Sequence, residues 1–381
     1  MQAYTNEEHE NLRKRIRAFA ENVIAPRAQE LDEKEEFSVE LTRKMGEAGI
    51  LGINMPTEYG GGGADTLSYI IAVEELARVD SSQAATVVAH NSLGLVPLLD
   101  YGSEEQKKRL LPQLTTGEHL WAFGLTEENA GSDARGTETT AVREGDHWVI
   151  NGAKRYITNA ATPITLGVTL QVMTPNEQGE PKLTTILVES DTPGFSTERM
   201  LGKMMWRAAD TGRISLKDCK VPLSNTLGRE GQGARYMLKT LDGGRLSVAA
   251  MGLGLAQGAF ELAAQHARTR KQFGKPIGRN QAIAFKLADM DMKIELARNT
   301  LYKACWLKDQ GKSYNREAAI AKLYTSEIAR EVADEAVQIF GGSGLFKDNP
   351  IERFYRDQRL LQIGEGTSEI LRLVISRHLG V

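Results

Sequence analysis

Apolar residues recur at helical spacing over the first third of the chain. In the segment that begins at Glu7, steps of up to four residues separate the apolar positions Leu12, Ile16, Phe19, Ala20 and Val23, as on one face of a helix. Asp65 opens another periodic run, and Ser103 is followed by two glutamates, the pattern of a helix cap and an acidic first turn. Residues 1–120 are therefore predicted to form an α-helical domain.

The pattern changes at Trp121. Short runs rich in β-branched and aromatic residues follow, and Gly, Asn, Asp and Pro separate them, as in strands joined by turns. These runs are 147–150, 164–172, 182–188 and 213–216. No helical pattern lies between them, which argues against a parallel sheet with crossover helices. Residues 121–228 are predicted to form a small β-domain.

Helical spacing returns in residues 229–381, in longer segments than before. The segments are 234–268, 281–310, 316–340 and 368–379, and these lengths suit a helical bundle. The predicted fold class is mainly α with a central β-domain.

Size and charge exclude several classes of protein. A chain of 381 residues exceeds the size at which one hydrophobic core stops growing. Its 47 basic and 50 acidic side chains lack the basic excess that a nucleic-acid partner would need. The first residues are polar and acidic, unlike a targeting segment, and no stretch reaches the roughly 20 apolar residues of a membrane span. We expect a cytoplasmic protein with neither a nucleic-acid nor a membrane partner.

The sequence gives little support for a metal site or a nicotinamide-binding site. Two cysteines are too few for a disulfide framework, and the six scattered histidines form no recognisable ligand pattern, so no metal site is predicted. The glycine-rich run 252–258 superficially resembles a dinucleotide fingerprint, but it lies inside a helical segment with no strand before it. Close packing of helices is the better interpretation of its glycines.

Three segments could carry chemistry. Residues 124–133, GLTEENAGSD, form a turn rich in small residues and hydroxyls, which can donate to a phosphate or to a flavin. Residues 338–345, QIFGGSGL, end a helix with glycines that allow close approach of a backbone or a cofactor. Residues 362–369, QIGEGTSE, lead into the last helix. Taken singly, these segments have plainer interpretations: a surface turn, a helix stop and a solvated charge at Glu365.

Together, these segments resemble the acyl-CoA dehydrogenase family. GLTEENAGSDARG is similar to the family's first signature, and QIFGGSGLFKDNPIERFYRD, residues 338–357, matches its second at every defined position. The resemblance extends from near Thr5 to the C-terminus. It implies an N-terminal helical domain, a middle β-barrel-like domain and a C-terminal four-helix bundle.

The resemblance also implies a non-covalent FAD, held between the β-domain and the bundle. Thr126 would meet the pyrimidine side of the flavin and Ser132 the pyrophosphate, while Tyr156 and Thr158 would pack against the ring. Thr367 and Glu369 would complete the contacts made by this chain. Further positions match residues that bind the FAD of a neighbouring subunit: Arg270, Gln272, Phe273, Gln281, Gln338 and Gly342. A homo-oligomer is implied, usually a tetramer.

The resemblance identifies Glu365 as the catalytic base. The α-proton of a thioester is weakly acidic, so its removal needs a base and a group that stabilises the enolate oxygen. In the family the N–H of the base and a ribityl hydroxyl hold that oxygen, while the β-hydride passes to flavin N5. Some relatives carry a glutamate directly before the arginine that matches Arg245, but Gly244 stands there in this chain. Asp242 and Arg245, with Ser132, are assigned to the acyl-CoA; the plainer interpretation of Arg245 is a surface salt bridge.

The residues around the predicted base suggest an acyl group. Relatives that act on straight chains commonly carry tyrosine where this chain has Gly364, so we hypothesise a branched, cyclic or aryl-substituted acyl group. His90 and Asn91 lie in the segment 87–92, which matches the helix that closes the acyl cavity. They are either substrate contacts or hydrogen-bonded structure. The segment has no arginine, which disfavours a dicarboxylic acyl group. Relatives usually have glycine at Met205, which here could reshape the loop beside the flavin or fill space.

Other activities on the same fold remain as alternatives. An acyl-CoA oxidase would pass electrons to oxygen, and an enoyl-CoA reductase would work in the reverse direction. A non-catalytic flavin-binding protein is a further alternative from a different class. For the dehydrogenase, the expected redox partner is an electron-transfer flavoprotein.

Overall fold

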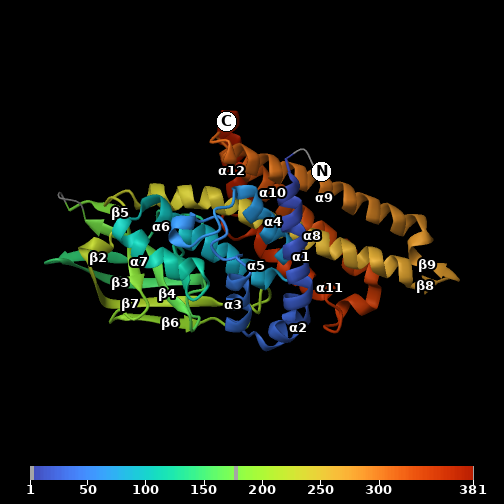
Figure 1. The fold of residues 1–381 in the computed structure, drawn as a ribbon, viewed down its shortest axis with the longest axis horizontal. Coiled ribbons are helices and arrows are strands. Elements are labelled where there is room, and N and C mark those ends of the chain that lie inside the picture. Colours follow the sequence, from blue (N-terminus) through green and yellow to red (C-terminus); the bar gives the residue numbers. More distant parts are fainter. Residues whose placement is uncertain (1–3, 176–178, 381) are drawn as a thin grey trace.

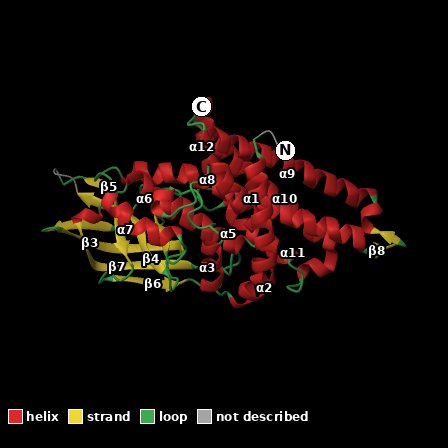
Figure 2. Ribbon diagram, in the orientation of Figure 1, coloured by secondary structure: helices red, strands yellow, loops and turns green. Residues whose placement is uncertain are grey.

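Helices form both ends of the chain and strands form its middle (Figures 1 and 2). The computed structural model describes residues 4–175 and 179–380. The predicted fold class is confirmed: a helical domain, a β-sheet domain and a second helical domain follow one another. The start of α1 and the end of α12 both lie towards the upper edge of the view in Figure 1.

The N-terminal domain contains seven α-helices among the described residues. They are α1 (Glu7–Phe19), α2 (Ala25–Lys34), α3 (Val39–Glu47), α4 (Thr66–Ala77), α5 (Ser81–Val88), α6 (Val96–Tyr101) and α7 (Glu104–Thr115). The predicted caps are present: the Asp65 side chain accepts from the N–H of Ser68, and Ser103 forms a reciprocal capping box with Gln106.

Two helices of this domain widen into π-helical turns. η1 (Ala20–Ile24) joins α1 to α2, and η3 (Ala89–Leu95) joins α5 to α6. Each turn is followed within two residues by a proline, Pro26 or Pro97. Proline has no N–H to continue the α-helical pattern, which favours such an irregular turn. Single π-helical turns are frequent at functional sites, and η3 contains two of the residues predicted to line the acyl cavity.

The middle domain is one seven-stranded sheet. Its strands are β1 (Leu120–Gly124), β2 (Thr140–Glu144), β3 (His147–Thr158), β4 (Thr165–Pro175), β5 (Pro181–Glu189), β6 (Phe195–Arg199) and β7 (Thr211–Pro222). The order is β1-β4-β2-β3-β7-β6, and β5 pairs with β4. β1 is parallel to β4, whereas β3 and β7 are antiparallel, with Ile150 opposite Cys219. The four predicted runs fall in β3, β4, β5 and β7.

The C-terminal domain is a bundle of long helices. They are α8 (Gly233–Thr269), α9 (Gln281–Asp309), α10 (Asn315–Phe340) and α12 (Ser368–Leu379), within one residue of the predicted segments, with the short α11 (Ile351–Asp357) between α10 and α12. A two-stranded hairpin of β8 (Lys271–Gln272) and β9 (Lys275–Pro276) joins α8 to α9. The hairpin projects at the end of the molecule opposite the sheet (Figure 1).

α8 is the central helix of the molecule. A Cβ atom at Gly254 would lie 2.1 Å from the carbonyl oxygen of Glu74, and one at Gly258 would lie 2.1 Å from that of Arg78. The glycines of the run 252–258 therefore let α4 pack directly on α8, which confirms close helix packing as their role. α8 is long and apolar enough to cross a membrane by length and composition, but 78% of its apolar window is buried inside the fold. A core helix of a globular protein has the same property.

Candidate active site

Glu365 lies in a strained turn between η7 (Gln358–Gln362) and α12. Its φ is 52° and that of Gly366 is 103°, and a left-handed backbone is costly for a residue with a side chain. Thr367 then caps α12 by accepting from the N–H of Ile370. Among the described residues, the N–H of Glu365 donates to no acceptor. The turn therefore leaves both the carboxyl group and the amide of Glu365 available to a ligand.

The carboxyl group of Glu365 has the character of a base. Glu365 is partly exposed as a residue, but its Oε2 atom is buried and has no hydrogen-bond partner among the described residues. Burial raises the pKa of Glu365 to about 7, although the positive charges of Lys322 and Arg245 act in the opposite direction. A carboxyl group with this pKa can accept a proton near neutral pH and release it afterwards.

α8 leaves room for this carboxyl group. A Cβ atom at Gly244 would lie 2.1 Å from Glu365 Oε2, so any side chain at residue 244 would displace the carboxylate. The neighbouring Arg245 is buried, and its Nη1 donates to Asp242 Oδ1 at 2.5 Å. Its Nε is buried without a partner among the described residues. Asp242 and Arg245 therefore lie beside the base, and Arg245 keeps a donor free.

A buried hydroxyl group also lies near the base. Tyr69 of α4 is buried, and its hydroxyl has no hydrogen-bond partner among the described residues. Burial raises the pKa of Tyr69; the nearby hydroxyls of Ser247 and Ser92 oppose that rise, and the charge of Glu365 adds to it. No pattern in the sequence marks Tyr69, Ser247 or Lys322, because each occupies an ordinary core position of a helix.

His90 and Asn91 serve the backbone. Nε2 of His90 contacts the carbonyl oxygen of Leu114 at 2.8 Å, and Nδ1 accepts from the N–H of Trp121 at 3.1 Å. The amide of Asn91 accepts from Gly52 N–H and donates to the Ile50 carbonyl, both at 3.0 Å. Both residues are fully buried. This geometry favours a structural role for His90 and Asn91 over a polar contact with a substrate.

A buried ion pair holds the turn 124–133 against the sheet. Glu127 accepts from Lys154 Nζ at 2.6 Å and from the N–H groups of Glu138 and Thr139 at 2.6 and 3.1 Å. Burial alone would raise the pKa of Glu127, but Lys154 and these hydrogen bonds outweigh it and lower the pKa. Burial lowers the pKa of Lys154 to about 8. The glutamate in the turn thus fixes the backbone that carries Thr126 and Ser132.

The residues predicted to face the flavin lie close to this turn. The N–H of Arg155 donates to the Thr126 carbonyl at 2.9 Å, which brings Thr126 beside the end of β3. At Tyr156 the β3–β7 pairing is irregular, φ is 61° and the residue is 56% exposed. The hydroxyls of Thr126, Ser132 and Thr158 form no hydrogen bond within the described part of the chain. Free hydroxyls beside an exposed ring fit the polar edge and the flat face of a flavin.

The remaining predicted cofactor residues lie elsewhere. Arg270, Gln272, Phe273, Gln281, Gln338 and Gly342 are all exposed and belong to the end of the bundle that carries the β8–β9 hairpin. In Figure 1 this end is opposite the sheet, whose strand β3 contains Tyr156. Thr367 and Glu369 instead line a pocket of about 400 Å³ beside the Glu365 turn. One chain therefore does not bring all the predicted cofactor residues together.

The loop that contains Met205 and Trp206 lies against the core. Met205 is partly buried and packs on the main hydrophobic cluster. Trp206 has a φ of 46°, and its N–H donates to Asp357 Oδ1 at 2.7 Å. Met205 is not among the residues with positive φ, so this backbone does not require the glycine of relatives. Met205 fills space.

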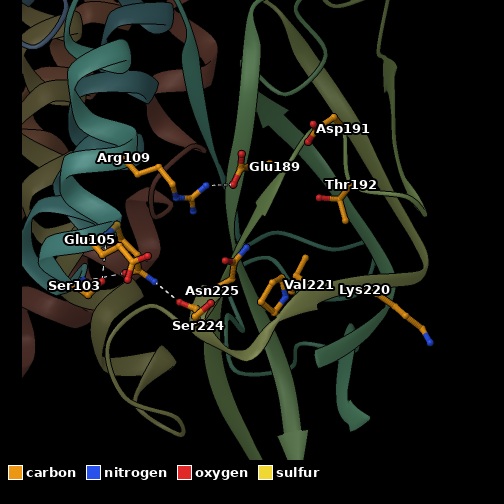
Figure 3. A pocket seen from close by; sticks show the side chains of 12 residues that line it. Ser103, Glu105, Arg109, Glu189, Asp191, Thr192, Lys220, Val221, Ser224 and Asn225 are labelled. Atoms are coloured by element: carbon orange, nitrogen blue, oxygen red, sulfur yellow. Dashed lines mark hydrogen bonds and ion pairs between the residues drawn. The ribbon is translucent and has the colours of Figure 1, made fainter. Parts of the chain in front are cut away.

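A larger pocket, of about 590 Å³, lies between α7 and the sheet (Figure 3). Its charged side chains include Arg109 and Glu189, which form an ion pair with each other. Neither Glu365 nor any other residue of its surroundings lines this pocket. It is a polar surface cleft distinct from the candidate active site.

Together, the helical, β-sheet and helical domains and the Glu365 carboxyl group, whose Oε2 has no partner among the described residues, fit a class of enzyme that uses a buried carboxylate as a base. Three family models match the chain: the acyl-CoA dehydrogenase N-terminal domain at residues 6–118, the middle domain at 122–219 and the C-terminal domain at 231–380. The chain belongs to the acyl-CoA dehydrogenase family, and it is an acyl-CoA dehydrogenase enzyme.

Full-length relatives agree with this assignment. The chain is 47% identical over 372 residues to the probable acyl-CoA dehydrogenase YngJ of Bacillus subtilis, covering 98% of both chains. It is 45% identical over 369 residues to the short-chain specific acyl-CoA dehydrogenase of Clostridium acetobutylicum, covering 97% of both. It is also 41% identical over 372 residues to the acryloyl-CoA reductase (NADH) of Anaerotignum propionicum, covering 97% of this chain and 94% of the relative.

Solved structures share the whole fold. Butyryl-CoA dehydrogenase from Megasphaera elsdenii superposes with a TM-score of 0.96 at 40% identity over all of both chains. A chain from a study of the electron transferring flavoprotein of Acidaminococcus fermentans has a TM-score of 0.96 at 42% identity, covering 100% of this chain and 99% of that chain. An acyl-CoA dehydrogenase complexed with FAD from Bacillus anthracis has a TM-score of 0.93 at 35% identity, covering 98% of this chain and 67% of that chain. The family binds FAD.

Proposed function

We propose that this enzyme removes hydrogen from the α and β carbons of an acyl-CoA thioester, with Glu365 as the base that takes the α-proton. The observation that most directly supports this proposal is the position of Glu365 Oε2. It is buried without a partner among the described residues, in the space that Gly244 leaves open. The free N–H of Glu365 would hold the thioester oxygen as negative charge develops on it. FAD, when bound, supplies the acceptor for the β-hydrogen and its electron pair.

The positions of the cofactor residues support a homo-oligomer. Thr126, Ser132, Tyr156 and Thr158 would bind the flavin part of FAD from the sheet, with Thr367 and Glu369 nearby. The exposed residues around the β8–β9 hairpin would reach the FAD of a neighbouring subunit. A tetramer is the assembly that we expect, in the cytoplasm, where the two buried free cysteines, Cys219 and Cys305, would stay reduced.

The geometry at Gly364 supports a bulky acyl group. A Cβ atom there would meet only Leu360, at 3.6 Å or more, so the fold does not require glycine at this position. Its missing side chain would leave room beside the Cα–Cβ bond for a branched, cyclic or aryl substituent. The names of several relatives specify short chains instead, so butyryl-CoA is the competing substrate.

Enoyl-CoA reduction is the second candidate. The same base and flavin would serve both directions, and a relative covered over almost its full length is named as an acryloyl-CoA reductase. An electron-transfer flavoprotein is the redox partner that we propose for either direction.

The test is the visible spectrum of the purified, FAD-loaded enzyme under anaerobic conditions. Linear, branched, cyclic and aryl-substituted acyl-CoAs are added one at a time. Bleaching of the flavin band identifies dehydrogenation and the preferred acyl class together. Faster bleaching by butyryl-CoA or octanoyl-CoA than by any branched or cyclic member would reject the bulky substrate. A flavin-loaded enzyme that no acyl-CoA bleaches would reject the dehydrogenation itself and favour the reductase.

A further inference from the structure

Lys322, in the first half of α10, is a buried cation without a carboxylate partner. Its side chain is completely buried, and its Nζ donates to the backbone carbonyl of Gly366 at 2.6 Å. No ion pair forms with it among the described residues. Burying an ammonium group in this way is costly, because a single carbonyl replaces its hydration shell only in part. The packing of α10 by itself gives no reason for a charge here.

The carbonyl that Lys322 holds belongs to the residue directly after the base. Glu365 and Gly366 both have positive φ, so the direction of the Glu365 side chain depends on keeping this unusual turn. α10 also holds the two flanks of the turn through Glu327. Oε2 of Glu327 accepts from Gln362 Nε2, and its Oε1 accepts from Ser368 Oγ, both at 2.8 Å. The hydrogen bond from Lys322 to Gly366 attaches the turn to α10 at a third point, between Gln362 and Ser368.

Lys322 also contributes charge. The groups that face Glu365 are Lys322 from α10, Arg245 from α8 and the neutral Tyr69 from α4. Arg245 is paired with Asp242, whereas Lys322 has no such pair. Burial lowers the pKa of Lys322 to about 8; the charges of Glu365 and Glu327 oppose that effect, and the charge of Arg245 adds to it. Lys322 is therefore the positive charge near Glu365 that is not paired with a carboxylate among the described residues.

We propose that Lys322 is a positioning residue for the dehydrogenation: its ammonium group fixes the left-handed turn that aims the Glu365 carboxyl group, and its charge favours the ionised base. This inference rests on the proposed function of Glu365. In this proposal Lys322 acts through the Gly366 carbonyl that it holds.

The test compares Lys322→Met and Lys322→Gln in the FAD-loaded enzyme, measuring kcat and KM against pH together with the Tm. Methionine has a similar length, and it removes both the charge and the donor. We expect kcat to fall roughly 10- to 100-fold through loss of alignment, with little change in KM. Glu365 acts ionised, so activity is lost as pH falls through its pKa. Removing a nearby positive charge raises that pKa, and the acid limb should move up by about one pH unit.

Lys322→Gln separates the two effects. Glutamine keeps an N–H donor but no charge, so kcat at high pH should recover in part while the acid limb stays shifted. Because a buried unpaired charge has been removed, neither variant should lose Tm. Lys303→Met, at an exposed lysine of α9, is the control and should match the wild type in both the pH profile and Tm.

Several results would overturn the proposal. An unshifted acid limb in Lys322→Met, or a fall in kcat that only accompanies a fall in Tm, would make Lys322 a structural residue. Failure of both variants to fold would have the same meaning. If the wild-type enzyme itself fails to bleach with every acyl-CoA, the proposed function has failed, and not only this inference.

Discussion

Glu365 carries two separate free-energy costs at the candidate site. Its backbone lies in the left-handed region, which costs roughly 1–3 kcal/mol. Its Oε2 is buried without a partner, which costs roughly another 1–3 kcal/mol. Nothing in the packing of the fold requires either feature. Both are explained if the carboxyl group must stay unpaired until a substrate presents its α-proton.

Gly244 and Gly243 offer a matched pair for testing this geometry. A Cβ atom at Gly244 would lie 2.1 Å from Glu365 Oε2, whereas one at Gly243 would meet only Lys308 Nζ, at 3.8 Å. Gly244→Ala should therefore displace the base and lower kcat roughly 100-fold, as measured by flavin reduction with the preferred acyl-CoA.

Gly243→Ala is the control, and it should keep kcat while gaining up to about 1 kcal/mol of stability from helix propensity. Equal kcat values in the two variants would show that Glu365 moves aside without consequence.

At the scale of elements, small residues decide how closely the helices approach. α8 contacts α4 through glycine, and the backbone of Glu74 fills the space where a Cβ of Gly254 would lie. α8 also packs against α9 and α10, so it cannot move away from α4. Backbone contact of this kind cannot be relieved by rotating a side chain.

Gly254→Ala should consequently destabilise the enzyme by about 1–3 kcal/mol, although alanine is the better helix former. The free energy of unfolding in urea, compared with that of Gly243→Ala on the same helix, checks this. We expect Gly254→Ala to lower the free energy of unfolding and Gly243→Ala to raise it. A stabilised Gly254→Ala enzyme would mean that α4 and α8 do not pack as described.

At the scale of the whole molecule, the C-terminal domain exposes many apolar side chains. Phe273 at the hairpin tip is 93% exposed, and the other large apolar residues exposed on this domain include Phe285, Met292, Leu296, Leu345, Phe346 and Leu373. Exposed apolar surface of this extent usually marks a contact with another chain. The predicted cofactor residues near the hairpin are in the same region, which connects assembly to cofactor binding.

Phe273→Ser should accordingly weaken the oligomer and lower the retained FAD. Light scattering during gel filtration measures the first effect, and the flavin absorbance per chain measures the second. Val142→Ser, at an exposed valine on β2, should change neither. If Phe273→Ser leaves the oligomer and the flavin content unchanged, Phe273 does not lie in the interface.

Much of the fold follows from local pattern. The four long segments predicted for the C-terminal domain agree within one residue with α8, α9, α10 and α12, because a long helix repeats its apolar spacing many times. The prediction of strands is less complete, since it does not assign β1, β2 and β6 individually. These three strands have five residues each, whereas the four strands that the runs mark have nine or more.

The site is predictable only where a motif carries it. Glu365 and the turn 124–133 stand in segments that resemble the acyl-CoA dehydrogenase family, and that resemblance implies flavin-dependent chemistry. Lys322, Tyr69 and Ser247 have no such signal. Each is a single polar residue on a mostly apolar helix, and its importance depends on what lies across the packed interface.

The sequence by itself determined the order of the three domains and the helices of the bundle, and it marked Glu365 as the candidate base, because period and motif are properties of neighbouring residues. Only the tertiary structure decided that Gly244 makes room for Glu365, that Lys322 holds the turn of the base and that His90 serves the backbone of Leu114 and Trp121. These contacts join residues far apart in the chain. Their existence depends on how elements pack, and no local pattern records that.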